Sequence, residues 1–212
     1  MIVVAIIGVL AAIAIPNFMR FQARSKQSEA KTALRTLFTG QKAYFAEKDR
    51  YSLNTGDVAF APERGNRYLY DLGVLGGGGT CPAGNMESRT GAVAVPANNE
   101  CGVQADVFRH GSAAQVSNLT NFAGVGAVTV GSTLTGLTAV APGPVAVGVY
   151  GVCPLCGFSA VARGNVDGDP GTDVFVVSSD FLGVATAGCV EDGLTAESPG
   201  SPINIRSDVV CE

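Results

Sequence analysis

The first nineteen residues of the chain carry no charged side chain, and apolar positions dominate them. As one helix this run extends about 28 Å, close to the ~30 Å hydrocarbon core of a bilayer. Its nine strongly apolar side chains favour transfer out of water by about 3–5 kcal/mol. They are Ile2, Val3, Val4, Ile6, Ile7, Val9, Leu10, Ile13 and Ile15. The pattern predicts that residues 1–22 form an apolar helix, held in a membrane or in a bundle of copies of itself.

A cleaved signal peptide is the alternative interpretation of this run. Such a peptide carries basic residues before its apolar stretch and a small-x-small cleavage site after it. Here the basic residues follow the run, beginning at Arg20, and no such site lies beside Asn17. A retained apolar helix is therefore favoured.

Two residues weaken this predicted helix. Gly8 costs about 1 kcal/mol relative to alanine inside a helix, and Pro16 removes a backbone hydrogen bond. We expect the segment between them to lose helix locally when copies of the chain assemble. The alternative is a plain kink at Pro16, which membrane helices tolerate.

Beyond Arg20 the apolar positions recur every three or four residues, which defines one face of a second, amphipathic helical stretch within residues 23–52. These positions are Ala30, Ala33, Leu34, Leu37, Phe38, Gln41, Tyr44 and Phe45. The charged run of residues 47–50 ends the pattern. An unbroken helix over both stretches would be about 75 Å long. We expect its second half to lie under a folded domain.

Residues 53–212 read as a globular head. Short β-like runs at 67–75, 102–109, 145–152, 158–162 and 174–178 alternate with Gly, Pro and Asn clusters. This spacing is typical of an antiparallel sheet with long loops. The predicted fold class is therefore α+β.

One long stretch of the head, residues 111–162, has no charged side chain. Solvent-facing surfaces usually carry interspersed charges. We interpret the stretch as a layer that contacts other copies of the chain or forms an outer surface, and a second β-layer of the same head is the alternative.

Charge is distributed unevenly. Residues 1–50 carry eight Lys/Arg and three Asp/Glu, a net charge of +5, whereas residues 51–212 carry six and fifteen, a net charge of −9. An acidic head argues against DNA as a partner. With one histidine, His110, and no GxSxG-like nucleophile motif, the sequence also argues against an enzyme, and we predict no catalytic residue.

Six cysteines favour an oxidising compartment, although sequence alone leaves fifteen possible pairings. Cys153 and Cys156 form a CxxC motif. A redox centre would need a thioredoxin-like βαβ context and a zinc site would need further ligands, so a structural disulfide is favoured.

Three carboxylates, Asp167, Asp169 and Asp173, fall in a Gly-bearing loop. Ca²⁺ prefers such oxygen ligands, but the terminal Glu of an EF-hand loop is absent, and Asp-Gly is also ordinary turn chemistry. A plain loop is favoured over a Ca²⁺ site, and no other cofactor is expected.

The segment MIVVAIIGVLAAIAIPNF, followed by RFQARSKQSEAKTALRTL, resembles the amino-terminal helix of type IV pilins. KAYFAEKDRYS and FAPERGNRY are similar to major pilins of gliding delta-proteobacteria, and residues 153–212 match more loosely. The resemblance implies a long helix with a β-sheet head and a helical filament with the nine apolar side chains in its core. Members of the family begin a few residues earlier, with a processed Phe-Thr-Leu-Ile-Glu-Leu stretch that carries a methylated amino terminus, so we expect Met1 to be internal.

The resemblance also implies partners and a location. We expect the inner membrane before assembly and a cell-surface filament afterwards, with other copies of the chain and the pilus assembly and retraction machinery as partners. Surface motility and adhesion, including contact with extracellular polysaccharide, follow from it. A type II secretion pseudopilin is one alternative. A minor pilin or tethered adhesin that binds polysaccharide or DNA is another.

The disulfide expectation rests partly on this resemblance. Cys189 and Cys211 bracket a carboxy-terminal loop like the disulfide-closed loop of pilins. We expect that pair to be bridged, Cys81 to pair with Cys101, and Cys153 to pair with Cys156.

Overall fold

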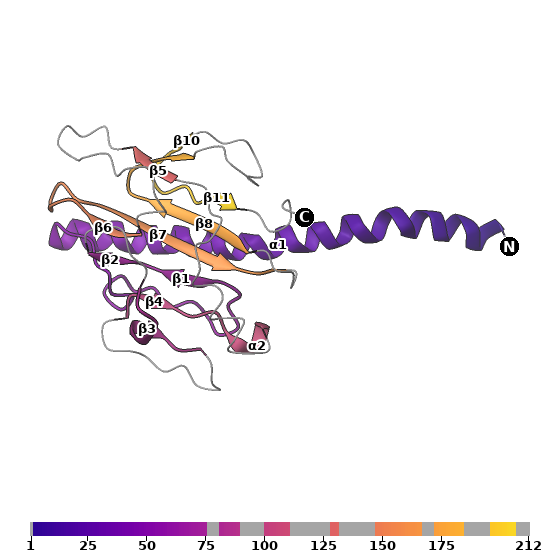
Figure 1. Cartoon of the computed structure of the whole chain (residues 1–212), viewed down its shortest axis with the longest axis horizontal. Helices are drawn as coiled ribbons and strands as arrows, with labels where there is room; N and C mark the ends of the chain where they lie inside the picture. Colours follow the sequence, from indigo (N-terminus) through magenta and orange to yellow (C-terminus); the bar gives the residue numbers. More distant parts are fainter. Residues whose placement is uncertain are drawn as a thin grey trace.

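One long helix and a β-rich head make up the computed structural model of the chain. The structure describes residues 2–75, 81–89, 100–110, 128–131, 147–166, 172–184 and 196–206. Helix α1 runs unbroken over Ile2–Lys48, and its first half projects beyond the head (Figure 1). The separate chain is thus helical through both Gly8 and Pro16. The expected loss of helix concerns the assembled state and stays a prediction.

The second half of α1 packs against the head along a narrow stripe. The stripe consists of Ala23, Gln27, Ala30, Leu34, Leu37 and Gln41. Alternating steps of four and three residues keep these positions on one side of the helix. The predicted amphipathic helix is confirmed, and its buried face begins earlier than the apolar pattern indicated, because alanine and glutamine occupy the first two positions.

The end of α1 has a local cause. Asp49 adopts a left-handed backbone with φ 54°, and its N–H donates to the carbonyl oxygen of Phe45 at 2.8 Å. A residue in this conformation terminates a helix while satisfying one of its last carbonyls. The helix therefore stops at Lys48, within the charged run that the sequence analysis expects to close it.

The described strands of the head are short, apart from two. They are β1 (Leu69–Asp71), β2 (Val74–Leu75), β3 (Met86–Glu87), β4 (Gly102–Val103), β5 (Val128–Gly131), β6 (Gly148–Tyr150), β7 (Gly157–Gly164), β8 (Asp173–Ser178), β9 (Phe181–Val184), β10 (Ala196–Glu197) and β11 (Ile203–Arg206). A 3-10 turn, η1, covers Ala83–Asn85, and a short helix, α2, covers Val107–His110.

Eight of these strands form one sheet, with the order β11-β8-β7-β1-β4-β3 and with β6 pairing both β7 and β2. Most pairs are antiparallel, but β2 with β6 and β3 with β4 are parallel. The predicted antiparallel sheet is thus confirmed for most pairs, and these two parallel pairs make it a mixed sheet. Strands β7 and β8 contact α1 and cross its second half (Figure 1).

A second, three-stranded sheet has the order β10-β9-β5. Strand β5 comes from the uncharged stretch 111–162 and pairs antiparallel with β9. Both interpretations of the uncharged stretch stay predictions. Residues 111–127 and 132–146 lie outside the described residues.

The predicted strand at 102–109 is mostly wrong. Only its first two residues form β4, and its end forms α2. Asp106 explains the change, because its carboxylate accepts the N–H of Phe108 at 3.0 Å and the N–H of Gly65 at 2.9 Å. An aspartate that accepts a backbone N–H two residues later caps the start of a helical turn.

The main core lies between the helix stripe and the sheet. Leu34 and Leu37 meet Phe158 of β7 and Phe175 of β8 in one cluster of buried apolar side chains. The ring of Tyr51, just after the helix, lies tilted against the ring of Phe158, with the two ring centroids 4.7 Å apart. The second half of α1 is thus an integral part of the head, while its first half has no such cover among the described residues.

Candidate assembly surface

The first half of α1 presents its aliphatic side chains to the outside. The nine predicted assembly side chains, from Ile2 to Ile15, are between 54% and 79% exposed. A stretch of this length and composition is apolar enough to cross a membrane. Such a surface is unstable in water and requires lipid or protein to cover it.

Three further apolar side chains extend this surface toward the head. Phe18, Met19 and Phe21 are each at least 60% exposed. The predicted set stopped at Ile15, although the uncharged run already signalled residues 18 and 19. We define the assembly surface as the exposed apolar residues of 2–21. It ends just before Ala23, the first buried residue of the stripe.

A buried polar cluster fixes α1 against the sheet where the assembly surface ends. The Oδ1 atom of Asp173, on β8, accepts a hydrogen bond from Nε2 of Gln27 at 2.9 Å. Its Oδ2 atom accepts a hydrogen bond from the hydroxyl group of Tyr68, also at 2.9 Å. All three residues are almost fully buried, and burial raises the pKa of the Tyr68 hydroxyl, which stays protonated. Hydrogen bonds to a charged group are worth more than those between neutral groups. The cluster therefore sets the position of the helix along the head.

Two contacts at the edge of the head add to this anchor. Lys26 Nζ donates to the carbonyl oxygen of Val166 at 3.0 Å. Glu29 accepts both the N–H of Arg67 and its guanidinium, at 2.8 and 3.0 Å. Both are partly exposed, so each contributes less than the buried cluster.

We expect Tyr68→Phe to lower the free energy of unfolding by about 1–3 kcal/mol, because Asp173 loses a buried donor. Tyr70→Phe is the matched control. Tyr70 is equally buried, and its hydroxyl has no hydrogen-bond partner among the described residues. Chemical denaturation of the detergent-solubilised chain compares the two variants, and equal losses would contradict the assigned role of Tyr68.

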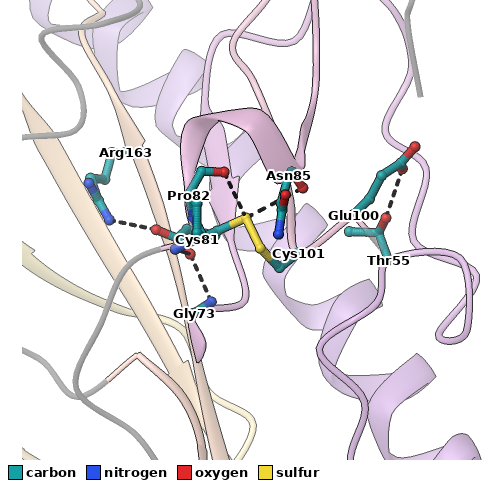
Figure 2. Close-up of a disulfide and its surroundings, with 9 residues drawn as sticks. Thr55, Gly73, Cys81, Pro82, Asn85, Glu100, Cys101 and Arg163 are labelled. Atoms are coloured by element: carbon teal, nitrogen blue, oxygen red, sulfur yellow. Dashed lines mark hydrogen bonds and ion pairs between the residues drawn. A yellow bond between two sulfur atoms is a disulfide. The ribbon is translucent and has the colours of Figure 1, made fainter. Parts of the chain in front are cut away.

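The head contains a second buried polar cluster, beside a disulfide. Asp71 of β1 is fully buried and accepts the N–H groups of Gly73 and Cys81 at 2.7 and 2.9 Å. Arg163 of β7 donates to its other oxygen at 2.9 Å. Figure 2 shows three of the residues that bond or surround this carboxylate, Arg163, Gly73 and Cys81, close together and next to Cys101. The cluster ties three segments of the head to one another.

The described cysteines are paired. The structure joins Cys81 to Cys101 and Cys153 to Cys156, with Cα atoms 5.5 and 4.4 Å apart. These are the pairs that the sequence analysis expects. Cys189 and Cys211 lie outside the described residues, and their bridge stays a prediction for peptide mapping under non-reducing conditions.

The possible Ca²⁺ ligands are described only in part. Asp173 is fully buried, and both of its oxygens accept hydrogen bonds from protein groups. Asp167 and Asp169 lie outside the described residues, so the Ca²⁺ hypothesis stays a prediction. Within the part of the chain that the structure covers, no group of three or more His, Cys, Asp or Glu is placed to hold a metal ion.

Comparison with known proteins agrees with this architecture. Residues 21–173 match the family model described as type IV pilin PilA. The chain is also 44% identical over 218 residues to the type IV major pilin protein PilA of Myxococcus xanthus (strain DK1622), a match that covers all of this chain and 90% of that relative. The chain belongs to the type IV pilin family. This pilin is therefore a structural, non-enzymatic subunit of the type IV pilus, as its sequence predicts.

Membership of the type IV pilin family indicates which environments the protein occupies. A major pilin passes from a membrane into a pilus made of copies of itself. Both environments cover apolar helix, the first with lipid and the second with protein. The exposed apolar surface of residues 2–21 is of the kind that needs such cover.

Proposed function

We propose that this pilin polymerises through the apolar residues 2–21 of α1 into an extracellular filament used for surface motility and adhesion. The main support for this proposal is that the apolar side chains of residues 2–21 are exposed, whereas the second half of the same helix is packed against the head. Before assembly the same surface holds the pilin in the inner membrane. Assembly and retraction machinery then moves it between these two states.

Filament abundance tests this proposal. Deletion of the coding sequence should remove the dominant protein from a sheared-surface preparation and should abolish movement over surfaces. Complementation with the wild-type chain should restore both. A preparation that is unchanged in the deletion strain would indicate a pseudopilin or a minor pilin instead.

We further propose that α1 loses helix between Gly8 and Pro16 in the filament. A residue that changes from helix to extended chain lengthens from about 1.5 to about 3.3 Å, which lets one subunit reach more neighbours. The freed carbonyl groups would be met within the bundle. A filament map at side-chain resolution with continuous helix over Ile2–Lys48, as in the separate chain, would contradict this.

For adhesion, extracellular polysaccharide fits the head better than DNA does. The net charge of −9 over residues 51–212 repels a polyanion over most of the surface. We expect filaments to bind neutral polysaccharide with little dependence on salt. Tight DNA binding along the shaft that falls steeply with salt would favour a DNA-uptake role.

A further inference from the structure

A cleft is lined by residues from the end of α1, from β2 and from β6. Figure 1 shows these elements at the end of the head farthest from the N-terminus. The volume of the cleft is about 750 Å³. Ligand pockets commonly enclose about 300–1,000 Å³. Three parts of the chain that are distant in sequence line the cleft: residues within 44–57, Gly73–Leu75 with Pro82, Asn85 and Cys101, and residues within 149–153. The cleft is separate from the assembly surface on residues 2–21.

Both described disulfides brace this cleft, since Cys101 and Cys153 are among its lining residues. Figure 2 shows Pro82 and Asn85 beside the first disulfide. The N–H of Cys101 donates to the carbonyl oxygen of Asn85 at 3.0 Å, and the N–H of Asn85 donates to the carbonyl oxygen of Pro82 at 2.8 Å. Gly73 is held by its hydrogen bond to buried Asp71. A wall fixed in this way loses little conformational freedom when a ligand binds.

The polar groups of the lining combine donors and acceptors without net charge. Arg50 supplies only donors, Asp57 supplies only acceptors, and the amides of Asn54 and Asn85 supply both. Asp57 already accepts Ser52 Oγ at 2.7 Å, which orients its carboxylate and leaves further acceptor capacity. Such a set suits a ligand whose groups both donate and accept, as hydroxyl groups do.

The lining also contains an aromatic and an exposed aliphatic side chain. Tyr44 contributes a half-buried aromatic ring, and Leu75 is 78% exposed at the rim. The C–H face of a sugar ring packs on such side chains, while its hydroxyl groups reach the polar ones. A phosphate or uronate ligand would meet one negative and one positive side chain in the lining, Asp57 and Arg50, and gain no net attraction.

We propose that this cleft binds a neutral saccharide and is the adhesive site of the head. The proposal rests on the proposed function, in that adhesion to polysaccharide is assigned there to the filament. It adds the site and the charge class of the ligand. Arg50, Asp57, Asn54 and Asn85 hold the hydroxyl groups, and Tyr44 and Leu75 contact the ring.

The test compares sheared filaments of the wild type, of an Arg50→Ala/Asn85→Ala variant and of a Glu63→Ala control. Arg50, Asn85 and Glu63 are all exposed, and Glu63 is not part of the cleft lining. Fluorescently labelled oligomers of glucose, mannose and N-acetylglucosamine are titrated against each filament by co-sedimentation, with polygalacturonate as the anionic comparison. Should the double variant not assemble, detergent-solubilised full-length subunits are titrated in the same way.

We expect at least one neutral oligomer to bind saturably to wild-type and Glu63→Ala filaments, and the double variant to bind it about tenfold more weakly. Equal binding by all three filaments overturns the cleft as the site. Binding of polygalacturonate alone, or of no oligomer, overturns the neutral-saccharide ligand. Filament yield and surface movement are recorded in the same strains. Wild-type cells without filaments would count against the proposed function, whereas normal filaments without cleft-dependent binding would count against this inference alone.

Discussion

Replacing Ile6 with aspartate or Leu10 with lysine should abolish surface filaments. Both side chains belong to the assembly surface, where they are 54% and 62% exposed in the separate chain. A charged side chain near the middle of an apolar helix costs about 2.5–3.5 kcal/mol in a membrane. In a filament the cost recurs at every subunit, so a small loss per contact is multiplied along the polymer. Electron microscopy and sheared-protein yield measure the result.

Ile6→Leu and Leu10→Met are the matched controls, because they keep the apolar character and nearly the same volume. They should assemble as the wild type does. Membrane extraction separates failure to insert into the membrane from failure to polymerise. A variant that inserts but forms no filament has lost only its contacts with other subunits. Normal filaments from Ile6→Asp would show that the side chain is not covered by neighbouring helices.

The second large effect is expected inside the head. Arg163→Met should lower the free energy of unfolding by about 3–5 kcal/mol, because it leaves the charge of fully buried Asp71 without its cation. The double variant Asp71→Asn/Arg163→Met should recover much of the loss. Asparagine keeps an acceptor oxygen for the N–H groups of Gly73 and Cys81 but removes the charge. Chemical denaturation of detergent-solubilised chains measures the free energy of unfolding of the wild type, of Arg163→Met and of the double variant.

The destabilisation caused by Arg163→Met should also depend on pH. Burial raises the pKa of Asp71, whereas the hydrogen bonds from Cys81 and Gly73 and the charge of Arg163 lower it, and the raising effect is larger. A raised pKa in the folded state means that the folded chain holds the proton more tightly than the unfolded chain does. The contribution of Asp71 to the free energy of unfolding is therefore fully present below pH 3.8, its ordinary pKa. It is lost as the pH rises through the pKa of Asp71 in the folded state.

Arg163→Met removes a group that favours the carboxylate, so the folded-state pKa of Asp71 rises further. The difference in stability between Arg163→Met and the wild type should be largest at neutral pH. It should shrink as the pH approaches the ordinary carboxyl value. A difference that is constant across this range would contradict a charged Asp71 in the neutral folded protein.

The long helix could be predicted because its signal is local. An uncharged run followed by an apolar repeat of three and four residues specifies both halves of α1 without knowledge of the head. The polar members of the stripe were harder to predict. Gln27 has no apolar character, and it is buried because Asp173, 146 residues away in sequence, accepts its amide.

Pairing within the head depends on contacts that no short window contains. The apolar runs at 158–162 and 174–178 predicted β7 and β8 well, because fully buried strands read as continuous apolar runs. The parallel pairing of β2 with β6 joins residues more than seventy positions apart. The cleft was missed for the same reason, since Arg50, Asn85 and Cys153 carry no common motif and are brought together only by the folded chain.

The stripe on α1 also determines how the subunit bears tension. Its six positions lie along one side of the helix, so a pull along the helix axis shears every contact at once instead of peeling them in turn. To repack, the helix would have to slide by a whole repeat, about 10 Å. Gln27, near one end of the stripe, donates to Asp173, and Gln41, at the other end, bonds the backbone of Ser52. Sliding would break both sets of hydrogen bonds together, so the head and the helix should bear tension as one mechanical unit.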